Sequence, residues 1–343
     1  MMYVVTGGAG FIGANIVRAL NDRGIDDVLV VDDLEVSERF KNVGDCEIAH
    51  CLDKGDFLKS LEAGRFANQL NAVLHEGACS DTMEQNGRYV MENNYEYSKT
   101  LLHFCQQGKI PLVYASSASV YGAGPEFREA RQCEAPLNVY GNSKLRFDQY
   151  VQRILPRRTA QITGLRYFNV YGDREQHKGR MASVAFQFFN QYRRSGHVNL
   201  FRGSGGYDDG EQRRDFISVE DVMAVNLFFL DHPDKSGIFN VGTGRSQSFN
   251  DIAMAVINSV RCAEGEPALS LNQLQSQGVI RYVDFPGGLK AKYQSFTQAD
   301  IGALRAAGFT KPFLTVEEGV ERYVRRLLRN VNGGTPESAA KHG

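Results

Sequence analysis

The sequence predicts an α/β protein built on a doubly wound parallel sheet, followed by a smaller mixed α/β lobe. Three observations carry this prediction. From Met2 to about Arg166, short β-rich runs alternate with helical stretches, which is the pattern of βαβ units on a parallel sheet. A glycine-rich turn follows the first of these runs. After Arg166 the order becomes less regular, and glycine-rich segments at 202–210 and 241–244 interrupt it.

The individual elements of the first half follow from local pattern. We expect helices between the strands because apolar residues recur there at three- and four-residue spacing, as at Ile16 and Leu20. Gly24 lies where a glycine would end the first helix. The predicted strands are 2–6, 28–32, 46–50, 72–75, 111–115 and 161–166.

The composition excludes several classes of protein. The chain has 343 residues, 42% hydrophobic and 23% charged, with a formal net charge of -1, which favours neither nucleic acid nor an anionic membrane as a partner. Without a basic, apolar signal segment or a run of about 18 apolar residues, we expect a cytoplasmic protein. The six cysteines form no C-x-x-C pair, so we expect reduced thiols, no disulfide and no metal site.

A glycine turn between the first strand and the first helix predicts a dinucleotide site. Residues 6–13 read Thr-Gly-Gly-Ala-Gly-Phe-Ile-Gly, with Gly7, Gly10 and Gly13 in G-x-x-G-x-x-G spacing. These glycines let the backbone approach a pyrophosphate, whose charge meets the free N–H groups of the helix N-terminus. Asp32, at the end of the second strand, suits a ribose hydroxyl. The context predicts a Rossmann-type domain.

The choice of nicotinamide stays open on the residues. Asp32 and Asp33 can bond a ribose 2′-hydroxyl, as an NAD site does. Arg39, Lys41 and Lys54 can instead meet the 2′-phosphate of NADP. We favour NADP as the cofactor, with NAD as the alternative.

The chain divides accordingly. We expect an NADP-binding Rossmann-type domain over residues 1–170, to which parts of 210–245 return. A substrate-binding lobe follows over residues 171–330. The last residues, 333–343, lack apolar periodicity and are expected to be disordered.

Tyr140 and Lys144 form a candidate catalytic pair. Their i and i+4 spacing brings both side chains to one face of a helix. A neighbouring ammonium favours the phenolate, so Lys144 would lower the pKa of Tyr140 and make it a base for a substrate hydroxyl. Ser117, at the carboxyl end of the fifth strand, can reach the same oxygen, since ligands of open α/β sheets bind there. Taken alone, Y-x-x-x-K is more often an exposed helical pair.

Together, the glycine turn, the serine and the Y-x-x-x-K pair resemble the extended short-chain dehydrogenase/reductase superfamily. The run 214–222, Arg-Asp-Phe-Ile-Ser-Val-Glu-Asp-Val, is similar to the segment in which members acting on nucleotide sugars supply an arginine to the substrate diphosphate. Arg214 suits this role because its planar fork meets phosphate oxygens with two bonds. The alternative is a surface arginine paired with Asp215.

Longer runs resemble one family within it, the ADP-L-glycero-D-manno-heptose 6-epimerases of lipopolysaccharide inner-core biosynthesis. The resemblance extends from about residue 2 to 330. It implies an NADP-dependent isomerase that inverts C6 of ADP-D-glycero-D-manno-heptose through a transient ketone and hydride return. It also implies a homo-oligomer such as a pentamer. The runs are 75–80, 93–95, 137–141, 176–186 and 293–300.

By that resemblance, Tyr140 and Lys178 are the two acid/base residues. Ser117 holds the substrate hydroxyl, and Lys144 touches the cofactor ribose and Tyr140. Two proton carriers are useful because the ketone must turn to take the hydride on its other face, so its oxygen then lies elsewhere. Lys178 follows the sixth strand in a glycine-flanked loop, where burial would lower its pKa into a useful range. Without the family, it is an exposed loop lysine.

The resemblance also implies two sets of binding residues. The cofactor set, with the glycine turn, is Gly7, Gly10, Phe11, Ile12, Gly13, Asp32, Asp33, Arg39, Lys54, Glu76, Gly77, Ala78, Cys79, Ser80, Asn93 and Lys144. The nucleotide-sugar set is Ser117, Asn169, Val170, Lys178, Arg180, Gln187, Phe201, Arg202, Gly203, Ser204, Arg214 and Tyr293. Arg180 and Gln187 depart from relatives with Ser and His there, and residues 205–211 look like a lengthened loop.

Three rival interpretations remain. A nucleotide-sugar 4,6-dehydratase needs an Asp-Glu pair just after the serine, where this chain has Ala118 and Ser119. A UDP-hexose 4-epimerase shares Ser, Tyr and Lys, so the residues alone do not exclude it, although Lys178 and the heptose-type runs favour the heptose enzyme. A sensor or scaffold that binds NADP without catalysis is the non-enzyme alternative. Such proteins usually break Y-x-x-x-K, which this chain keeps.

Overall fold

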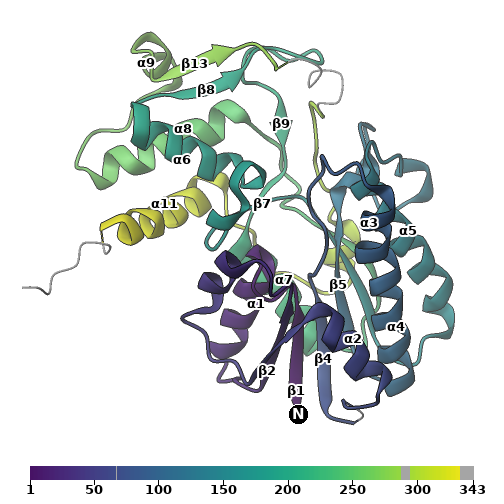
Figure 1. The fold of residues 1–343 in the computed structure, drawn as a ribbon. Coiled ribbons are helices and arrows are strands. Elements are labelled where there is room, and N and C mark those ends of the chain that lie inside the picture. The colour runs from purple at the N-terminus through teal and green to yellow at the C-terminus, as the bar shows by residue number, and fades with distance from the viewer. Residues whose placement is uncertain (67, 287–293, 333–343) are drawn as a thin grey trace, which may run out of the picture.

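The computed structural model describes residues 1–66, 68–286 and 294–332 (Figure 1). Two expectations, the substrate contact of Tyr293 and the disordered tail at 333–343, lie outside the described residues. The described chain forms a large sheet with helices on both faces and a smaller layer of helices and short strands above it.

The large sheet has seven strands, all parallel to their neighbours. Its order is β11 (Gly237–Val241), β6 (Ile162–Tyr167), β5 (Leu112–Ser117), β4 (Leu70–His75), β1 (Met2–Thr6), β2 (Val28–Asp32) and β3 (His50–Asp53). The direction of winding reverses between β1 and β4, which confirms the predicted Rossmann-type doubly wound fold.

Burial explains which strands could be predicted from the sequence pattern. All five residues of β2 are buried, because a central parallel strand is covered on both faces. The third strand was expected at 46–50 but runs over His50–Asp53, where it pairs with Leu29–Asp32. It is an edge strand with half-exposed side chains, so no apolar run marked it. Cys46 instead packs from a loop, partly buried against the core.

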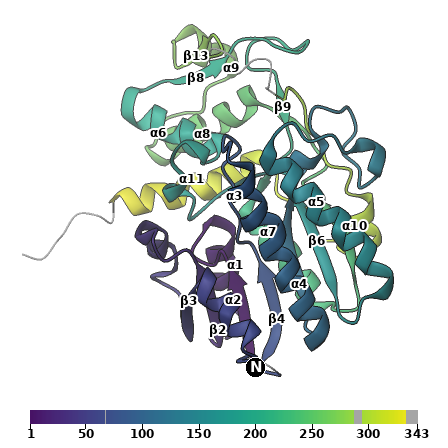
Figure 2. The same ribbon diagram turned by 45° about the vertical axis from the view of Figure 1, so that its right-hand side comes forward.

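Helices cover both faces of the sheet, with α1 (Phe11–Asn21), α7 (Val219–Asp231) and α10 (Gly302–Ala306) on one face and α2 (Lys54–Glu62), α4 (Tyr97–Gly108) and α5 (Val139–Ile154) on the other. Adjacent strand residues alternate between these layers: Val5 and Val30 pack with α1 and α7, whereas Val4 and Leu29 pack with α2 and α4. Figure 2 shows α2 and α4 in front of the strands.

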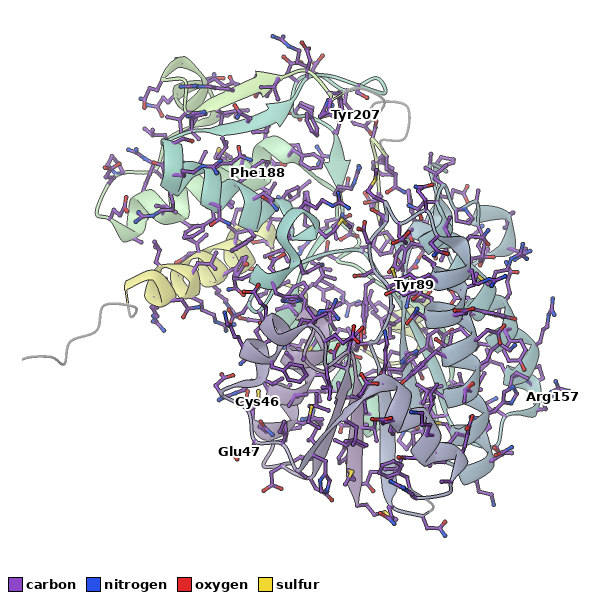
Figure 3. All side chains as sticks on the ribbon, viewed as in Figure 1. Cys46, Glu47, Tyr89, Arg157, Phe188 and Tyr207 are labelled. Carbon is purple, nitrogen blue, oxygen red and sulfur yellow. The ribbon has the colours of Figure 1, made fainter. Side chains whose placement is uncertain are left out.

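The smaller layer holds its own core. Phe188 of α6, Val256 of α8 and Leu327 of α11 belong to one buried cluster, and Figure 3 labels Phe188 inside this upper layer. Three short pairs of strands join it: β10 with β7, β12 with β9 and β13 with β8. The elements are β7 (Asn169–Tyr171), α6 (Val184–Ser195), β8 (Val198–Phe201), β9 (Arg213–Arg214), β10 (Phe216–Ser218), β12 (Gln247–Ser248), α8 (Phe249–Ala263), α9 (Leu271–Ser276), β13 (Ile280–Val283) and α11 (Val316–Asn332).

The chain crosses between the layers more than once. After the smaller layer begins, α7 and β11 return to the large sheet, and Leu304, Phe309 and Phe313 also pack in its core. No helix of the described residues is long and apolar enough to cross a membrane. The remaining helical segments are η1 (Ser37–Val43), α3 (Gly87–Met91), η2 (Glu92–Glu96), η3 (Ala118–Tyr121), η4 (Arg131–Cys133), η5 (Leu155–Arg157) and η6 (Gln176–Met181).

Candidate active site

A cavity of about 710 Å³ lies between the two layers, at the carboxyl ends of the sheet strands. We call its sheet side the floor; it is made by lining residues of 6–13, 32–33, 76–82, 115–117 and 140–144. We call its upper side the roof; it is made by lining residues of 177–184 with Phe216 and Phe249. The cavity spans the point where the strand order reverses, which is where doubly wound sheets bind ligands.

The glycine turn is packed too tightly for side chains. Gly7 has a left-handed φ of +64°, and a Cβ on it would lie 2.6 Å from the nitrogen of Gly77. A Cβ on Gly13 would lie 2.1 Å from the carbonyl oxygen of Gly7. The helix that follows starts at Phe11 with no side-chain cap and no acidic residue in its first turn. This turn therefore fits a pyrophosphate, whose charge a helix N-terminus attracts.

A buried network fixes the floor beneath this turn. His75 Nδ1 lies 2.6 Å from Thr6 Oγ1, and His75 Nε2 lies 2.8 Å from Ser98 Oγ, which donates to the carbonyl of Asn94. Burial lowers the pKa of His75 to about 3, so the ring is neutral. The backbone N–H of Gly77 also donates to Thr6 Oγ1. One neutral histidine thus joins the ends of β1 and β4 to the start of α4.

At the far end of the floor, two carboxylates each meet a cation. Asp32 accepts from Arg39 (3.2 Å) and from the backbone N–H groups of Ala9 and Asp33. Asp33 accepts from Lys54 at 2.9 Å, and this contact lowers the pKa of Asp33. Asp32, Asp33, Arg39 and Lys54 all line the cavity.

Lys41, which the sequence also offered for a phosphate, is outside the lining. Its side chain is 79% exposed, and its ammonium lies 3.6 Å from Glu38. The choice between the two nicotinamides therefore concerns Arg39 and Lys54.

Ser117, Tyr140 and Lys144 meet at the centre of the floor. Ser117 ends β5, while Tyr140 lies in the first turn of α5, which Asn138 caps by accepting from the N–H of Gly141 at 2.7 Å. Tyr140 hydrogen-bonds to Ser117 through its side chain. Lys144 Nζ donates to the carbonyl of Ala115 at 2.8 Å.

The electrostatics of Tyr140 differ from the expectation. Burial raises the pKa of Tyr140 above its usual value, the hydrogen bond from Ser117 lowers it, and Lys144 is not among the causes. Burial also lowers the pKa of Lys144 to about 8. Of the causes that act on the pKa of Tyr140, the hydrogen bond with Ser117 is the one that favours the phenolate.

Glu76 is a buried carboxyl in the floor. Its Oε1 accepts from Tyr167 Oη at 2.9 Å, and Tyr167 in turn accepts from Asn226. Its Oε2 is buried and has no hydrogen-bond partner among the described residues. Burial raises the pKa of Glu76 to about 7. The floor thus holds a carboxyl that titrates near neutral pH.

Lys178 enters the same cavity from the roof. Its segment, η6, follows β7, and its Nζ lies 5.2 Å from the centre of the Phe11 ring. Burial lowers the pKa of Lys178, while the charge of Glu175 raises it. Lys178 is half-buried, not an exposed loop lysine. Tyr140 and Lys178 therefore line one cavity from two different layers.

The residues expected for the nucleotide sugar divide into two groups. Ser117, Asn169, Val170 and Lys178 line the cavity. Arg180, Gln187, residues 201–204 and Arg214 are not in its lining.

Local contacts hold this second group. Arg180 is 72% exposed and pairs with Asp81, which does line the cavity, at 2.9 Å. Gln187 donates to the carbonyl of Gly179, Arg202 lies near Asp284, and Gly203 donates to Asp209. Phe201 stacks on Phe285, and Ser204 bridges to Tyr207.

Arg214 corrects one alternative. It is buried, and its guanidinium lies 5.7 Å from the ring centre of Phe249, a roof residue. Asp215 accepts from the backbone N–H groups of Thr243 and Gly244. The interpretation of Arg214 as a surface residue is wrong.

Every residue that was expected to bind the cofactor lines the cavity. Sequence reasoning missed other lining residues. Tyr167 could have been found, because it ends β6 and strand carboxyl ends face the ligand. Tyr89, labelled in Figure 3, lies between the layers, and no local pattern marked it. The other missed lining residues include Thr6, Asp81, Tyr97, Phe168, His177, Met181, Phe216 and Phe249.

Comparison with known proteins agrees with this geometry. Residues 3–242 match the NAD dependent epimerase/dehydratase family. A protein of Thiobacillus denitrificans (strain ATCC 25259 / T1) called ADP-L-glycero-D-manno-heptose-6-epimerase is 62% identical over 95% of this chain and 98% of its own length. The crystal structure of the Helicobacter pylori protein of that name has a TM-score of 0.78 at 29% identity, covering 95% of this chain and 96% of that one. Thermus thermophilus UDP-glucose 4-epimerase, solved in complex with NAD, has a TM-score of 0.73 at 26% identity, covering 96% and 99%.

The chain therefore belongs to the NAD dependent epimerase/dehydratase family. The comparisons also confirm the narrower resemblance to the ADP-L-glycero-D-manno-heptose 6-epimerases. The protein is an isomerase with a nicotinamide cofactor, which sets aside the sensor or scaffold interpretation.

Proposed function

We propose that this enzyme inverts C6 of ADP-D-glycero-D-manno-heptose to give ADP-L-glycero-D-manno-heptose through a transient ketone and hydride return, with NADP as the cofactor. One observation carries the mechanism: Tyr140 from the floor and Lys178 from the roof line the same cavity as the glycine turn. The substrate is supported by the relative of 62% identity, whose name is that of this reaction's enzyme.

Two proton carriers suit this reaction. A bound nicotinamide supplies the acceptor that keeps the hydride while C6 is a planar ketone. Ser117 and Tyr140 hold the C6 hydroxyl, and Tyr140 Oη takes its proton as the C–H bond breaks. The hydrogen bond from Ser117 supports this role, because it opposes the rise in the pKa of Tyr140 that burial causes.

Lys178 serves the other orientation of the sugar. Once the ketone has turned, its oxygen is near the roof, where Lys178 Nζ gives the proton. Burial lowers the pKa of Lys178 toward the range in which an ammonium is a useful acid. Lys144 we assign to the cofactor ribose, since it lines the floor beside Ser117 and Tyr140.

We assign NADP over NAD because of Arg39 and Lys54. Both line the cavity beside Asp32 and Asp33. A guanidinium and an ammonium at this end suit a 2′-phosphate, whose charge two lone carboxylates would repel.

The nucleotide part of the substrate we assign to Arg214 and its neighbours. Arg214 is outside the cavity lining, and its guanidinium lies 5.7 Å from the ring centre of Phe249, a roof residue. A buried arginine fork suits the diphosphate. Asn169, Val170, Arg180, Gln187 and residues 201–204 complete the proposed substrate set.

The decisive experiment follows the hydrogen at C6. The enzyme is incubated with ADP-D-glycero-D-manno-heptose in heavy water, and the two sugars are resolved. Conversion without deuterium at C6 is expected, because the same hydride returns. Deuterium at C6 would mean proton abstraction from carbon and would reject the mechanism. Turnover of UDP-glucose with none of the heptose would instead favour a UDP-hexose 4-epimerase.

The two bases are tested separately. Tyr140→Phe and Lys178→Met should each lower kcat by about 10²- to 10⁴-fold, since each removes one proton carrier, while NADP still binds. Tyr150→Phe is the matched control, because Tyr150 lies on the same helix but not in the cavity lining. Near-normal turnover of Lys178→Met would reject the two-base assignment.

A further inference from the structure

Lys178 lies in a loop whose two ends are joined by the buried carboxylate of Glu175. We call residues 172–183 the Lys178 loop. Glu175 is fully buried within it. Glu175 Oε1 accepts from the N–H of Gly172 at 3.2 Å and from Ser183 Oγ at 2.7 Å. Glu175 Oε2 accepts from the N–H of Ser183 at 2.5 Å. Because Gly172 and Ser183 are the two ends of the loop, one side chain ties both ends together.

The chemistry of this clamp requires a carboxylate. Three donors converge on one group, and an ionised carboxyl has acceptors only. A glutamine of the same shape would turn an N–H group toward at least one of these donors, so that contact would be lost. Ser183 also caps α6, through its hydroxyl and the N–H of Phe186. The clamp therefore sets the start of α6 as well as the path of the loop.

The outer side of the Lys178 loop is attached to the sheet layer. Asn15 donates to the carbonyl of Asp173 at 2.9 Å. Arg174 pairs with Asp45 through two contacts of 2.7 Å. These contacts fix where the first part of the loop lies on the layer.

A further contact connects the loop to the glycine turn. The Asn42 side-chain nitrogen lies 2.9 Å from His177 Nδ1 and donates to the carbonyl of Ala9 at 3.0 Å. The outer contacts thus hold the loop against the sheet layer. Glu175 fixes the internal shape of the loop and hence the direction in which residue 178 projects.

Glu175 also acts on Lys178 by charge. The backbone N–H of Lys178 donates to the carbonyl of Glu175, so the two residues are one helical turn apart. The carboxylate raises the pKa of Lys178 against the lowering by burial. Around the pair, Tyr323 of α11 faces Glu175 and His177 is near Lys178, and burial is the first cause of the shifted pKa of each.

We propose that Glu175 is the positioning residue of Lys178: it closes the Lys178 loop so that the ammonium projects into the roof of the cavity beside Phe11. The proposal rests on the proposed function of Lys178 as a proton carrier. It makes Glu175, which no substrate atom needs to touch, a requirement of the reaction.

The test is a double-mutant cycle of Glu175→Gln and Lys178→Met, with kcat for the heptose substrate measured in the full-length enzyme at saturating substrate. A displacement on the order of 1 Å can cost about 100-fold in rate, so Glu175→Gln should lower kcat by about 10- to 100-fold. In the Lys178→Met background, Glu175→Gln should cause no further loss of kcat. An equal loss in both backgrounds, with Lys178→Met itself strongly impaired, would overturn the inference and leave the proposed function standing.

A second readout does not depend on activity. Reductive methylation of Lys178 by formaldehyde and cyanoborohydride, followed against pH by mass spectrometry, reports the titration of its amine. Removing the negative charge in Glu175→Gln lowers the pKa of Lys178, so the midpoint should fall. An unshifted midpoint would overturn the inference. Near-normal kcat of Lys178→Met would reject the proposed function, which this titration does not test.

Two further variants separate positioning from folding. Asp221→Asn also neutralises a buried carboxyl, one on α7 that accepts from the N–H of Leu314 at 2.9 Å and does not line the cavity. It should lower the Tm without changing kcat. Ser183→Ala keeps the Glu175 charge but removes one donor, and it serves if Glu175→Gln does not fold. Ser183→Ala should lower kcat less than Glu175→Gln does, and in the Lys178→Met background it should cause no further loss. A loss of kcat in that background would contradict the proposal.

Discussion

The floor and the roof of the cavity are built differently. The floor lies on buried parallel strands, and its key contacts are to backbone: Asp32, only 5% exposed, accepts from two N–H groups. The roof comes from η6, the starts of α6 and α8 and the short strand β10, and beside its lining Arg180 of η6 is 72% exposed in its pair with Asp81.

This difference has a physical consequence. Buried, fully bonded backbone is costly to move, whereas exposed ion pairs exchange easily with water. We therefore expect the floor to be more rigid than the exposed ion pair beside the roof.

The strongest challenge to a rigid floor is a methyl group in the glycine turn. Gly13→Ala would place its Cβ 2.1 Å from the Gly7 carbonyl oxygen, so the turn must shift. Overpacking of this kind costs about 2–3 kcal/mol, or about 30- to 160-fold in NADP affinity. Isothermal calorimetry measures it. Gly87→Ala, whose Cβ would meet only Val139 at 4.0 Å, should bind NADP normally. Equal affinity of both variants would mean the floor is not rigid.

Cofactor choice is a smaller effect at the far end of the floor. Arg39→Ala removes a guanidinium that we assign to the 2′-phosphate, so KM for NADP should rise by about 10-fold while KM for NAD stays within about twofold. Steady-state half-reactions with each dinucleotide measure this ratio. Lys41→Ala, which removes an exposed lysine paired with Glu38, is the control. An equal rise for NAD and NADP would contradict the assignment.

Glu76 gives a prediction on pH. Its pKa is raised to about 7 from an ordinary 4.5, so the folded state favours the neutral carboxyl. Stability contributed by this group is therefore present below pH 4.5 and is lost as pH rises toward 7. The shift corresponds to at most about 3 kcal/mol.

Glu76→Gln should remove this loss. Urea unfolding should show the variant more stable than the parent above pH 7, with the difference shrinking toward pH 4.5. A difference that is constant across this range would show that Glu76 is ionised in the folded protein.

The smallest effect is expected at Arg180, beside the lining of the roof. Arg180→Ala removes an exposed ion pair with Asp81, which contributes about 0–1 kcal/mol to the free energy of unfolding. We expect Tm to fall by at most a few degrees and kcat/KM to change by less than about fivefold. Thermal melts and initial rates measure both. If Arg180→Ala lowered kcat/KM by as large a factor as Gly13→Ala lowers NADP affinity, the floor and the roof would not differ as we describe.

The sequence predicted the floor of the cavity better than its roof. Phe11, Asp32 and Glu76 follow strand ends in a βαβ pattern, so their strands' topology brings them to one edge, and all line the cavity. Tyr140 and Lys144 share a helix, so local periodicity pairs them. The direction of the pKa shift of Tyr140 could not be inferred, because burial of the phenol is its largest cause and burial depends on how distant segments pack.

The sequence by itself determined the parallel sheet and the glycine turn, because strand patterning and glycine spacing act over a few neighbouring residues. Only the tertiary structure decided that the roof lies over the floor, that Arg214 is buried, and that Glu175 closes the Lys178 loop. These depend on packing and on hydrogen bonds between segments, and a single sequence carries no local signal for such contacts.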